Sequence, residues 1–342
     1  MLPNALRLCL CLLLASLTAH AGGTLRVLAW PGYADPDLVQ AFERQHDARV
    51  EVTFVTTDDD LWDRASAQGG ESFDVLAVNL AELQRLVNRG LVVPIKPDGI
   101  PNTRHQLKRF RDPATLPALQ RDGKLYAVPY TYAEMGLIYN RKLVKTTPTS
   151  MAALWEPRYR GRILLYEGSS HNFSMAALLA GISNPFQLSD ANFNKTVKQL
   201  IALRANRPLL YSSPEDVVKL FRTKPVALAF GNYGGQQIKA LRASGQDVGY
   251  IIPSEGALAW LDCWAVLMGG RDNPLASAWI NYTLNRDVSR QLTLRHGLSN
   301  TIEPSADSTE EDKLVWLQPV EDPERRAQFW QRILSGYRRG MF

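Results

Sequence analysis

Short apolar runs alternate with segments of helical periodicity along most of the chain after residue 23. Runs typical of buried strands span residues 25–30, 50–55, 73–78, 125–130, 135–140, 162–167, 226–230 and 248–252. Helical periodicity marks residues 61–67, 80–89, 172–180, 192–204, 214–221, 274–284, 287–295 and 325–336. A further helix is predicted after Asp35-Pro36, with Asp35 as its N-cap. This alternation predicts α/β folding around mostly parallel sheets.

The order of these elements suggests two α/β halves followed by a helical tail, which agrees with the length of 342 residues. Ligands of open α/β sheets bind beyond the carboxyl ends of strands. We therefore expect a ligand cleft between two lobes, lined by the loops 30–33, 79–81, 167–171 and 231–234. The net charge of +5 is spread along the chain, so nucleic-acid binding is not favoured.

The first 21 residues have the pattern of a cleaved signal peptide. Arg7 precedes an apolar stretch at 8–17, and Ala19-His20-Ala21 supplies the small-x-small cleavage pattern. The alternative is an N-terminal membrane anchor, but the apolar stretch is short for a permanent span. We predict export, with cleavage near Ala21.

Cleavage there leaves Cys263 as the single cysteine, inside the apolar run 261–267. We expect a buried thiol, with neither a disulfide nor a zinc site. The histidines are scattered, and the phosphate-binding, zinc-protease and nucleophile-elbow motifs are absent, so no metal, cofactor or catalysis is predicted. Asp58-Asp59-Asp60 is interpreted as a solvated helix start rather than a cation site.

Aromatic and acidic residues at strand ends are the strongest candidates for a binding site. Trp30 and Tyr33 follow the first strand, and either line a pocket or belong to the core. In the run 260–264, strand alternation places Trp260, Asp262 and Trp264 on one face. An acid between two tryptophans suggests either an aromatic cage for an amine, with Asp262 as counter-charge, or a structural salt bridge.

With these residues in view, the chain resembles the periplasmic spermidine/putrescine-binding proteins of bacterial ABC importers. The resemblance covers nearly all of the sequence after the signal peptide. It rests on the stretches 27–33 (VLAWPGY), 126–130 (YAVPY), 154–161 (LWEPRYRG) and 259–262 (AWLD).

The resemblance implies a two-lobed periplasmic binding protein fold of type II that closes on its ligand without catalysis. Lobe 1 would comprise residues 22–132 with 255–342 returning to it, and lobe 2 residues 133–254. The expected protein is a periplasmic monomer that delivers a small amine-bearing solute to an inner-membrane permease.

Carried over residue by residue, the resemblance makes Trp30 and Tyr33 aromatic walls of the amine pocket, Trp260 a stacking ring and Asp262 the acid that holds an ammonium group. The chain departs from the family elsewhere. Gly168 and His171 stand where the family has acids, Ala81 replaces an expected tyrosine, and Asn232 replaces a tryptophan in a register uncertain by one residue.

These departures leave two ligand classes open. Ser169, Ser170 and His171 precede an expected helix start at Phe173, where backbone N–H groups and hydroxyls favour an anion. This favours an ω-amino acid such as γ-aminobutyrate or 5-aminovalerate, unless these residues only cap the helix. Glu167 would supply a second acid and restore a polyamine such as putrescine or spermidine if the register slips.

Two other classes of protein compete with a solute-binding role. An exported α/β enzyme would need a catalytic constellation that the sequence does not show. The effector-sensing domain of a regulator would lack the export signal and would carry a DNA- or membrane-linked module.

Overall fold

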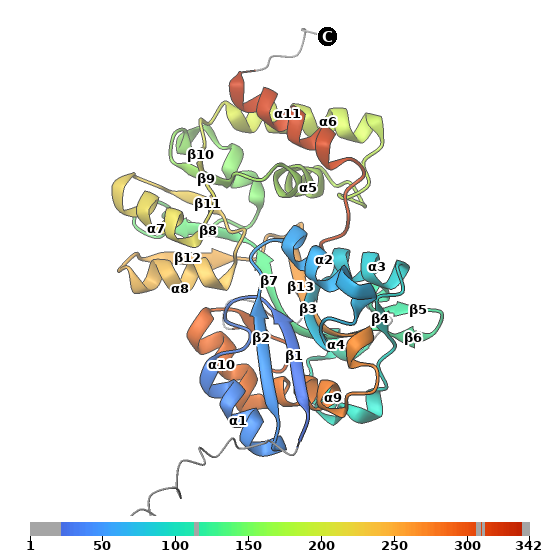
Figure 1. Ribbon diagram of the computed structural model, residues 1–342. Helices are drawn as coiled ribbons and strands as arrows, with labels where there is room; N and C mark the ends of the chain where they lie inside the picture. The colour runs from blue at the N-terminus through green and yellow to red at the C-terminus, as the bar shows by residue number, and fades with distance from the viewer. Residues whose placement is uncertain (1–21, 113–115, 306–308, 310–311, 337–342) are drawn as a thin grey trace, which may run out of the picture.

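The computed structural model describes residues 22–112, 116–305, 309 and 312–336, which form two α/β lobes (Figure 1). The predicted signal peptide, residues 1–21, lies outside the described residues. Within the described part of the chain, no helix combines the length and apolarity that a membrane span requires.

The sheet of the first lobe has the order β14-β7-β13-β3-β1-β2, with β4 and β15 also paired to β13. Its strands are β1 (Thr24–Ala29), β2 (Arg49–Phe54), β3 (Val75–Asn79), β4 (Val92–Val93), β7 (Ala127–Met135), β13 (Ala257–Leu267), β14 (Ser299–Asn300) and β15 (Leu314–Trp316). β1 is parallel to β2 and β3, whereas β13 is antiparallel to β3 and β7. A separate hairpin pairs β5 (Gln120–Arg121) with β6 (Lys124–Leu125).

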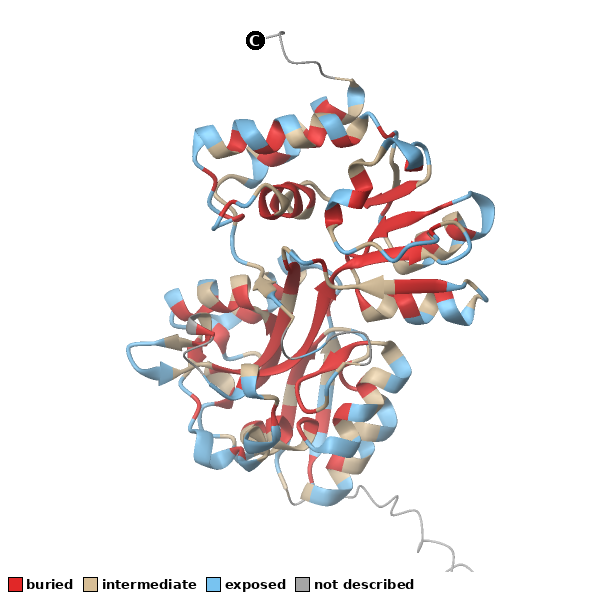
Figure 2. Cartoon of the chain, turned by 180° about the vertical axis from the view of Figure 1, so that it is seen from behind, coloured by how far each residue is buried: buried red, intermediate tan, exposed pale blue. Residues whose placement is uncertain are grey.

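Helices cover both faces of this sheet, which explains why β13 is buried along nearly its whole length (Figure 2). One face is covered by α1 (Pro36–His46), α9 (Pro274–Thr283) and α10 (Arg286–His296), through Phe42, Trp279 and Leu292. The other is covered by α2 (Asp58–Ser66), α3 (Leu80–Asn88) and α4 (Lys108–Arg111), through Leu61, Leu83 and Phe110.

The second lobe is built on a smaller sheet of order β10-β9-β11-β8-β12. Its strands are β8 (Leu137–Asn140), β9 (Ile163–Tyr166), β10 (Leu209–Tyr211), β11 (Leu228–Phe230) and β12 (Val248–Ile251). β9 is parallel to β10 and β11, and β8 is antiparallel to β11 and β12. Its helices are α5 (Ser169–Leu179), α6 (Asp190–Arg204), α7 (Pro214–Thr223) and α8 (Gly235–Ala243).

The first crossing between the lobes is a tight passage from β7 into β8 at Gly136. A Cβ atom at this position would lie 2.4 Å from the carbonyl oxygen of Ile251 and 2.6 Å from the ring of Tyr250. The Tyr250 hydroxyl donates to the carbonyl of Glu134 and accepts from the Gly136 N–H. This crossing therefore requires glycine, and it brings β7 and β12 together at the hinge.

The C-terminal helix α11 (Pro323–Ser335) packs on the second lobe, beside α5 and α6 (Figure 1). Trp330 and Ile333 join the core of that lobe, and the Trp330 indole N–H donates to the carbonyl of Glu167. The expected return of the whole range 255–342 to the first lobe is therefore wrong for this helix. Its amphipathic face finds its apolar partners on α5 and α6, reached by the segment 317–322.

Candidate functional site

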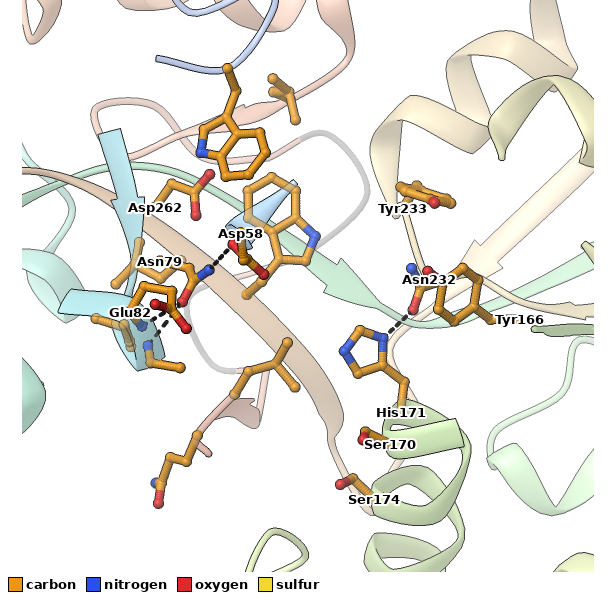
Figure 3. A pocket seen from close by; sticks show the side chains of 18 of the residues that line it. Asp58, Asn79, Glu82, Tyr166, Ser170, His171, Ser174, Asn232, Tyr233 and Asp262 are labelled. Carbon is orange, nitrogen blue, oxygen red and sulfur yellow. Dashed lines mark hydrogen bonds between the residues drawn. The ribbon is translucent and has the colours of Figure 1, made fainter. Parts of the chain in front are cut away.

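A cavity of about 530 Å³ lies between the two lobes, at the carboxyl ends of strands from both sheets (Figure 3). The first lobe contributes Trp30, Pro31, Tyr33, Asp58, Asn79, Leu80, Ala81, Glu82, Trp260, Leu261, Asp262 and Leu298. The second lobe contributes Tyr166, Ser170, His171, Ser174, Phe186, Asn232, Tyr233 and Gln236, and the segment between β15 and α11 adds Leu317, Gln318 and Val320.

Asp262 is a buried carboxylate on the first-lobe wall. It lies on β13 opposite Asn79 of β3, and its residue is only 8% exposed. The Tyr33 hydroxyl donates to its Oδ2 across 2.6 Å. No ion pair among the described residues includes Asp262, and burial raises the pKa of its carboxyl to about 7. A carboxylate in this state needs a cation to compensate its desolvation.

Three aromatic residues surround this acid. Trp30 and Tyr33 belong to a turn in which the Tyr33 N–H donates to the Trp30 carbonyl, and Gly32 adopts a φ of 90° against the ring of His296. Trp260 lies between the cores of both lobes and packs on each of them. These rings form apolar walls around Asp262, as cation–π recognition of an amine requires.

Trp264 shares the β13 face of Trp260 and Asp262 but does not line the cavity. It is fully buried in the first-lobe core, where its ring is tilted against Tyr130 and meets Trp279 edge to face. β13 runs from the cleft into the first lobe, so Trp264, two residues beyond Asp262, lies in the core of that lobe. The cage expected from the sequence therefore contains Trp260 but not Trp264.

Two further acids on the first-lobe wall were not predicted as pocket residues. Asp58 begins α2, and its Oδ1 accepts a hydrogen bond from the Asn79 side-chain amide across 2.9 Å (Figure 3). Glu82 lies in the first turn of α3, 3.4 Å from Arg85. Desolvation is the main reason that the pKa of each carboxyl is raised. Asp58 is the exposed helix start that the sequence predicted, and its side chain also lines the cavity, which the sequence did not predict.

The second-lobe wall is formed by the first turn of α5. This helix begins at Ser169, so the expected start near Phe173 is wrong. Ser170 and His171 line the cavity, whereas Ser169 does not. The ring of His171 stacks on Tyr166 with 5.7 Å between the centroids. Burial lowers the pKa of the His171 imidazole, which favours the neutral ring.

Asn232 holds His171 in place from the loop between β11 and α8. Its Oδ1 lies 2.6 Å from the His171 Nδ1, and its backbone N–H donates to the Tyr211 hydroxyl. Asn232 itself, the residue that the sequence matched to this wall, lines the cavity.

The charges of the cavity lining are unequal between the lobes. Asp58, Glu82 and Asp262 belong to the first lobe, and no lysine or arginine is found among the described lining residues. Arg326 of α11 approaches from behind α5, but it is fully buried and paired with Glu321 at 2.6 Å. Its guanidinium also donates to the Ser174 hydroxyl and the Ser170 carbonyl. Its charge is thus compensated outside the cavity.

Other chemistry finds no support at this site. Cys263 is fully buried on the opposite face of β13, and burial raises the pKa of its thiol, so it is not a nucleophile. Among the described residues there is no cluster of three or more histidine, cysteine, aspartate or glutamate side chains that could hold a metal ion.

Comparison with known proteins gives a consistent family. A family model described as bacterial extracellular solute-binding protein matches residues 37–318. Spermidine/putrescine-binding periplasmic protein 1 of Haemophilus influenzae is 22% identical over 90% of this chain and 82% of its own length. The putrescine-binding periplasmic protein PotF of Escherichia coli is 24% identical over 78% and 74%.

A solved structure shows the same fold. The spermidine/putrescine substrate-binding protein PotD of Streptococcus pneumoniae superimposes with a TM-score of 0.76 at 18% identity, covering 91% of this chain and 98% of its own. The expected two-lobed periplasmic binding protein fold is thereby confirmed.

Proposed function

Because this chain belongs to the bacterial extracellular solute-binding proteins, we propose that it captures an aliphatic diamine or polyamine, such as putrescine or spermidine, in the cleft between its lobes. The observation that carries the proposal is Asp262, a buried carboxylate that, within the described part of the chain, accepts a side-chain hydrogen bond from the neutral Tyr33 hydroxyl and from no cation. An ammonium group between Trp30, Trp260 and Asp262 supplies the missing positive charge. The relatives from Haemophilus influenzae and Escherichia coli are named for ligands of the same chemistry.

The remaining acids favour a second amine over a carboxylate. Asp58 and Glu82 repel a ligand carboxylate and attract a second ammonium group, and the described lining contains no lysine or arginine to oppose them. The alternative ligand is an ω-amino acid such as γ-aminobutyrate or 5-aminovalerate. Its carboxylate would contact the α5 N-terminus at Ser170, which is the single feature in its favour.

The proposed role of the protein is to capture a ligand for transport, without a catalytic step. A ligand that contacts both walls stabilises the closed arrangement of the lobes, which an ABC permease in the inner membrane would then recognise. We expect a periplasmic monomer, released by cleavage near Ala21. Mass spectrometry of the periplasmic fraction tests the export step, and a retained Met1 on a membrane-bound chain would contradict it.

Calorimetry with putrescine, spermidine, γ-aminobutyrate and 5-aminovalerate tests the ligand class. We expect the amines to bind and Asp262→Asn to weaken them by ten- to a hundredfold or more, since a hydrogen bond to a charged group contributes roughly 1.5–3 kcal/mol. Asp272→Asn, at an exposed acid outside the cavity, is the matched control and should bind like wild type. Unchanged affinity in Asp262→Asn would show that the acid is structural and that the amine site lies elsewhere.

A further inference from the structure

His171 presents a specific hydrogen-bonding atom to the cleft. Its Nδ1 lies 2.6 Å from the Oδ1 of Asn232, and an amide oxygen can only accept a hydrogen bond. The proton of a neutral imidazole must therefore be on Nδ1. Nε2 then carries a lone pair, and Figure 3 shows this second ring nitrogen turned toward the open cavity and the first-lobe wall.

The groups packed around the ring keep it neutral. Tyr166 of β9 stacks on it, and Tyr233, from the loop before α8, meets Tyr166 edge to face. Burial is the largest cause of the lowered pKa of the His171 imidazole, and the charge of Arg326, which is paired with Glu321, adds a smaller contribution. The facing carboxylates, Asp58, Glu82 and Asp262, belong to the opposite wall of the cavity.

We propose that the Nε2 of His171 accepts a hydrogen bond from the second amine of the ligand, and that this uncharged acceptor makes the site select an amine over a carboxylate at that end. The inference rests on the proposed amine-binding function and reverses the anion-binding role that the sequence suggested for the segment containing His171. The second lobe thus recognises an N–H group by geometry, while the first lobe supplies the negative charge.

The selection against a carboxylate follows from the same contact. A ligand carboxylate facing Nε2 would meet a lone pair, and moving the proton to Nε2 would leave two acceptors 2.6 Å apart at Nδ1 and the Asn232 Oδ1. With the Asn232 amide oxygen facing Nδ1, a carboxylate is therefore accepted only when the ring takes up a second proton from solvent. That protonated ring would in turn repel an ammonium group, so acid should shift the preference from diamine to ω-amino acid.

The ratio of two affinities isolates this effect. Putrescine and γ-aminobutyrate carry the same ammonium group for Asp262, so the titration of that acid cancels when their dissociation constants are compared at each pH. We expect putrescine to bind at least tenfold tighter than γ-aminobutyrate at pH 8, and the ratio to fall at least threefold by pH 5.5. In His171→Gln the fall should shrink to the part that Asp58 and Glu82 contribute, because the pKa of each of these carboxyls is raised. His105→Gln, at an exposed histidine outside the cavity, is the matched control and should keep the wild-type ratio.

Nitrogen NMR of the labelled full-length mature protein gives a readout that a purely structural role would not move. We expect a protonated Nδ1 and an unprotonated Nε2 at pH 8, with the Nε2 resonance shifting when putrescine is added. A proton on Nε2, an unshifted Nε2 resonance, or a pH-independent ratio in wild type would overturn the role of His171 while leaving amine binding intact. Absence of binding by every amine would instead overturn the proposed function and this inference with it.

Discussion

The two walls of the cleft differ in the polar groups that they offer to a ligand. The first-lobe wall carries three carboxylates, one buried in the middle of β13 and two in the first turns of α2 and α3, whereas the second-lobe wall offers hydroxyls, an amide and a neutral imidazole. Charge attraction acts over a longer range than a hydrogen bond, which requires contact and alignment. For the proposed amine ligand, we therefore expect the charges of the first lobe to attract it before it forms hydrogen bonds with the second lobe.

The largest expected effect concerns the stability of the ligand-free protein. The pKa of Asp262 rises from 3.8 to about 7 on folding, so the folded state binds this proton more tightly than the unfolded chain. Stability from this group is therefore full below about pH 4 and is lost as pH rises toward 7, a cost of roughly 4 kcal/mol at pH 8. Asp262→Asn should raise the melting temperature at pH 8 but not at pH 4. A variant that melts no higher than wild type at pH 8 would mean that Asp262 has a compensating partner.

The next effect is the pH dependence of amine binding. An ammonium ligand binds the ionised form of Asp262, so protonation of this carboxyl below its pKa of about 7 competes with binding. Putrescine affinity should be nearly constant above pH 7.5 and should fall toward tenfold per pH unit well below 7. Calorimetry in two buffers of different ionisation heat should also detect proton release on binding near pH 6.5. A flat affinity profile between pH 5.5 and 8 would contradict this account.

A smaller effect is expected from the partly exposed acids of the same wall. The double variant Asp58→Asn, Glu82→Gln should weaken putrescine by about tenfold, and the loss should shrink in high salt because both carboxylates are accessible to solvent. Asp59→Asn removes the adjacent charge, which does not line the cavity, and is the matched control. Equal weakening by Asp59→Asn would show a general field effect of the helix start rather than contact with the ligand.

Much of the fold was accessible from the sequence because each element carries a local signal. The runs at 25–30, 50–55 and 226–230 coincide with β1, β2 and β11 to within two residues. These runs are rich in apolar and β-branched residues, which favour strands. α8 escaped prediction because its Gly-Gln-Gln start lacks a capping residue and apolar periodicity. Asp35 does occupy the N-cap position of α1, but its side chain bonds Arg295 and His296 instead of the helix.

The site was predicted less evenly, for a physical reason. Trp30 and Tyr33 follow β1, and Trp260 and Asp262 share one face of β13, so strand pattern alone grouped them, and all four line the cavity. Asp58 and Glu82 lie in the first turns of helices, where acids are common because they interact favourably with the helix dipole. Their presence there therefore did not distinguish a pocket from a solvated surface. The packing of α11 on α5 depends on the complementarity of two distant helices, which no local pattern specifies.

The smallest effect compares two neighbouring serines on the second-lobe wall. Ser170 lines the cavity and Ser169 does not, although both begin α5. A neutral hydrogen bond contributes about 1 kcal/mol or less at a hydrated site, so Ser170→Ala should weaken putrescine by roughly threefold, and Ser169→Ala should change it by less than twofold. Because the first turn of α5 supplies hydroxyls rather than charge, the effect of Ser170→Ala should persist in high salt, unlike that of the Asp58 and Glu82 variants. Calorimetry of both variants at two salt concentrations measures this, and a salt-sensitive loss at Ser170 would show that the second-lobe wall also acts through charge.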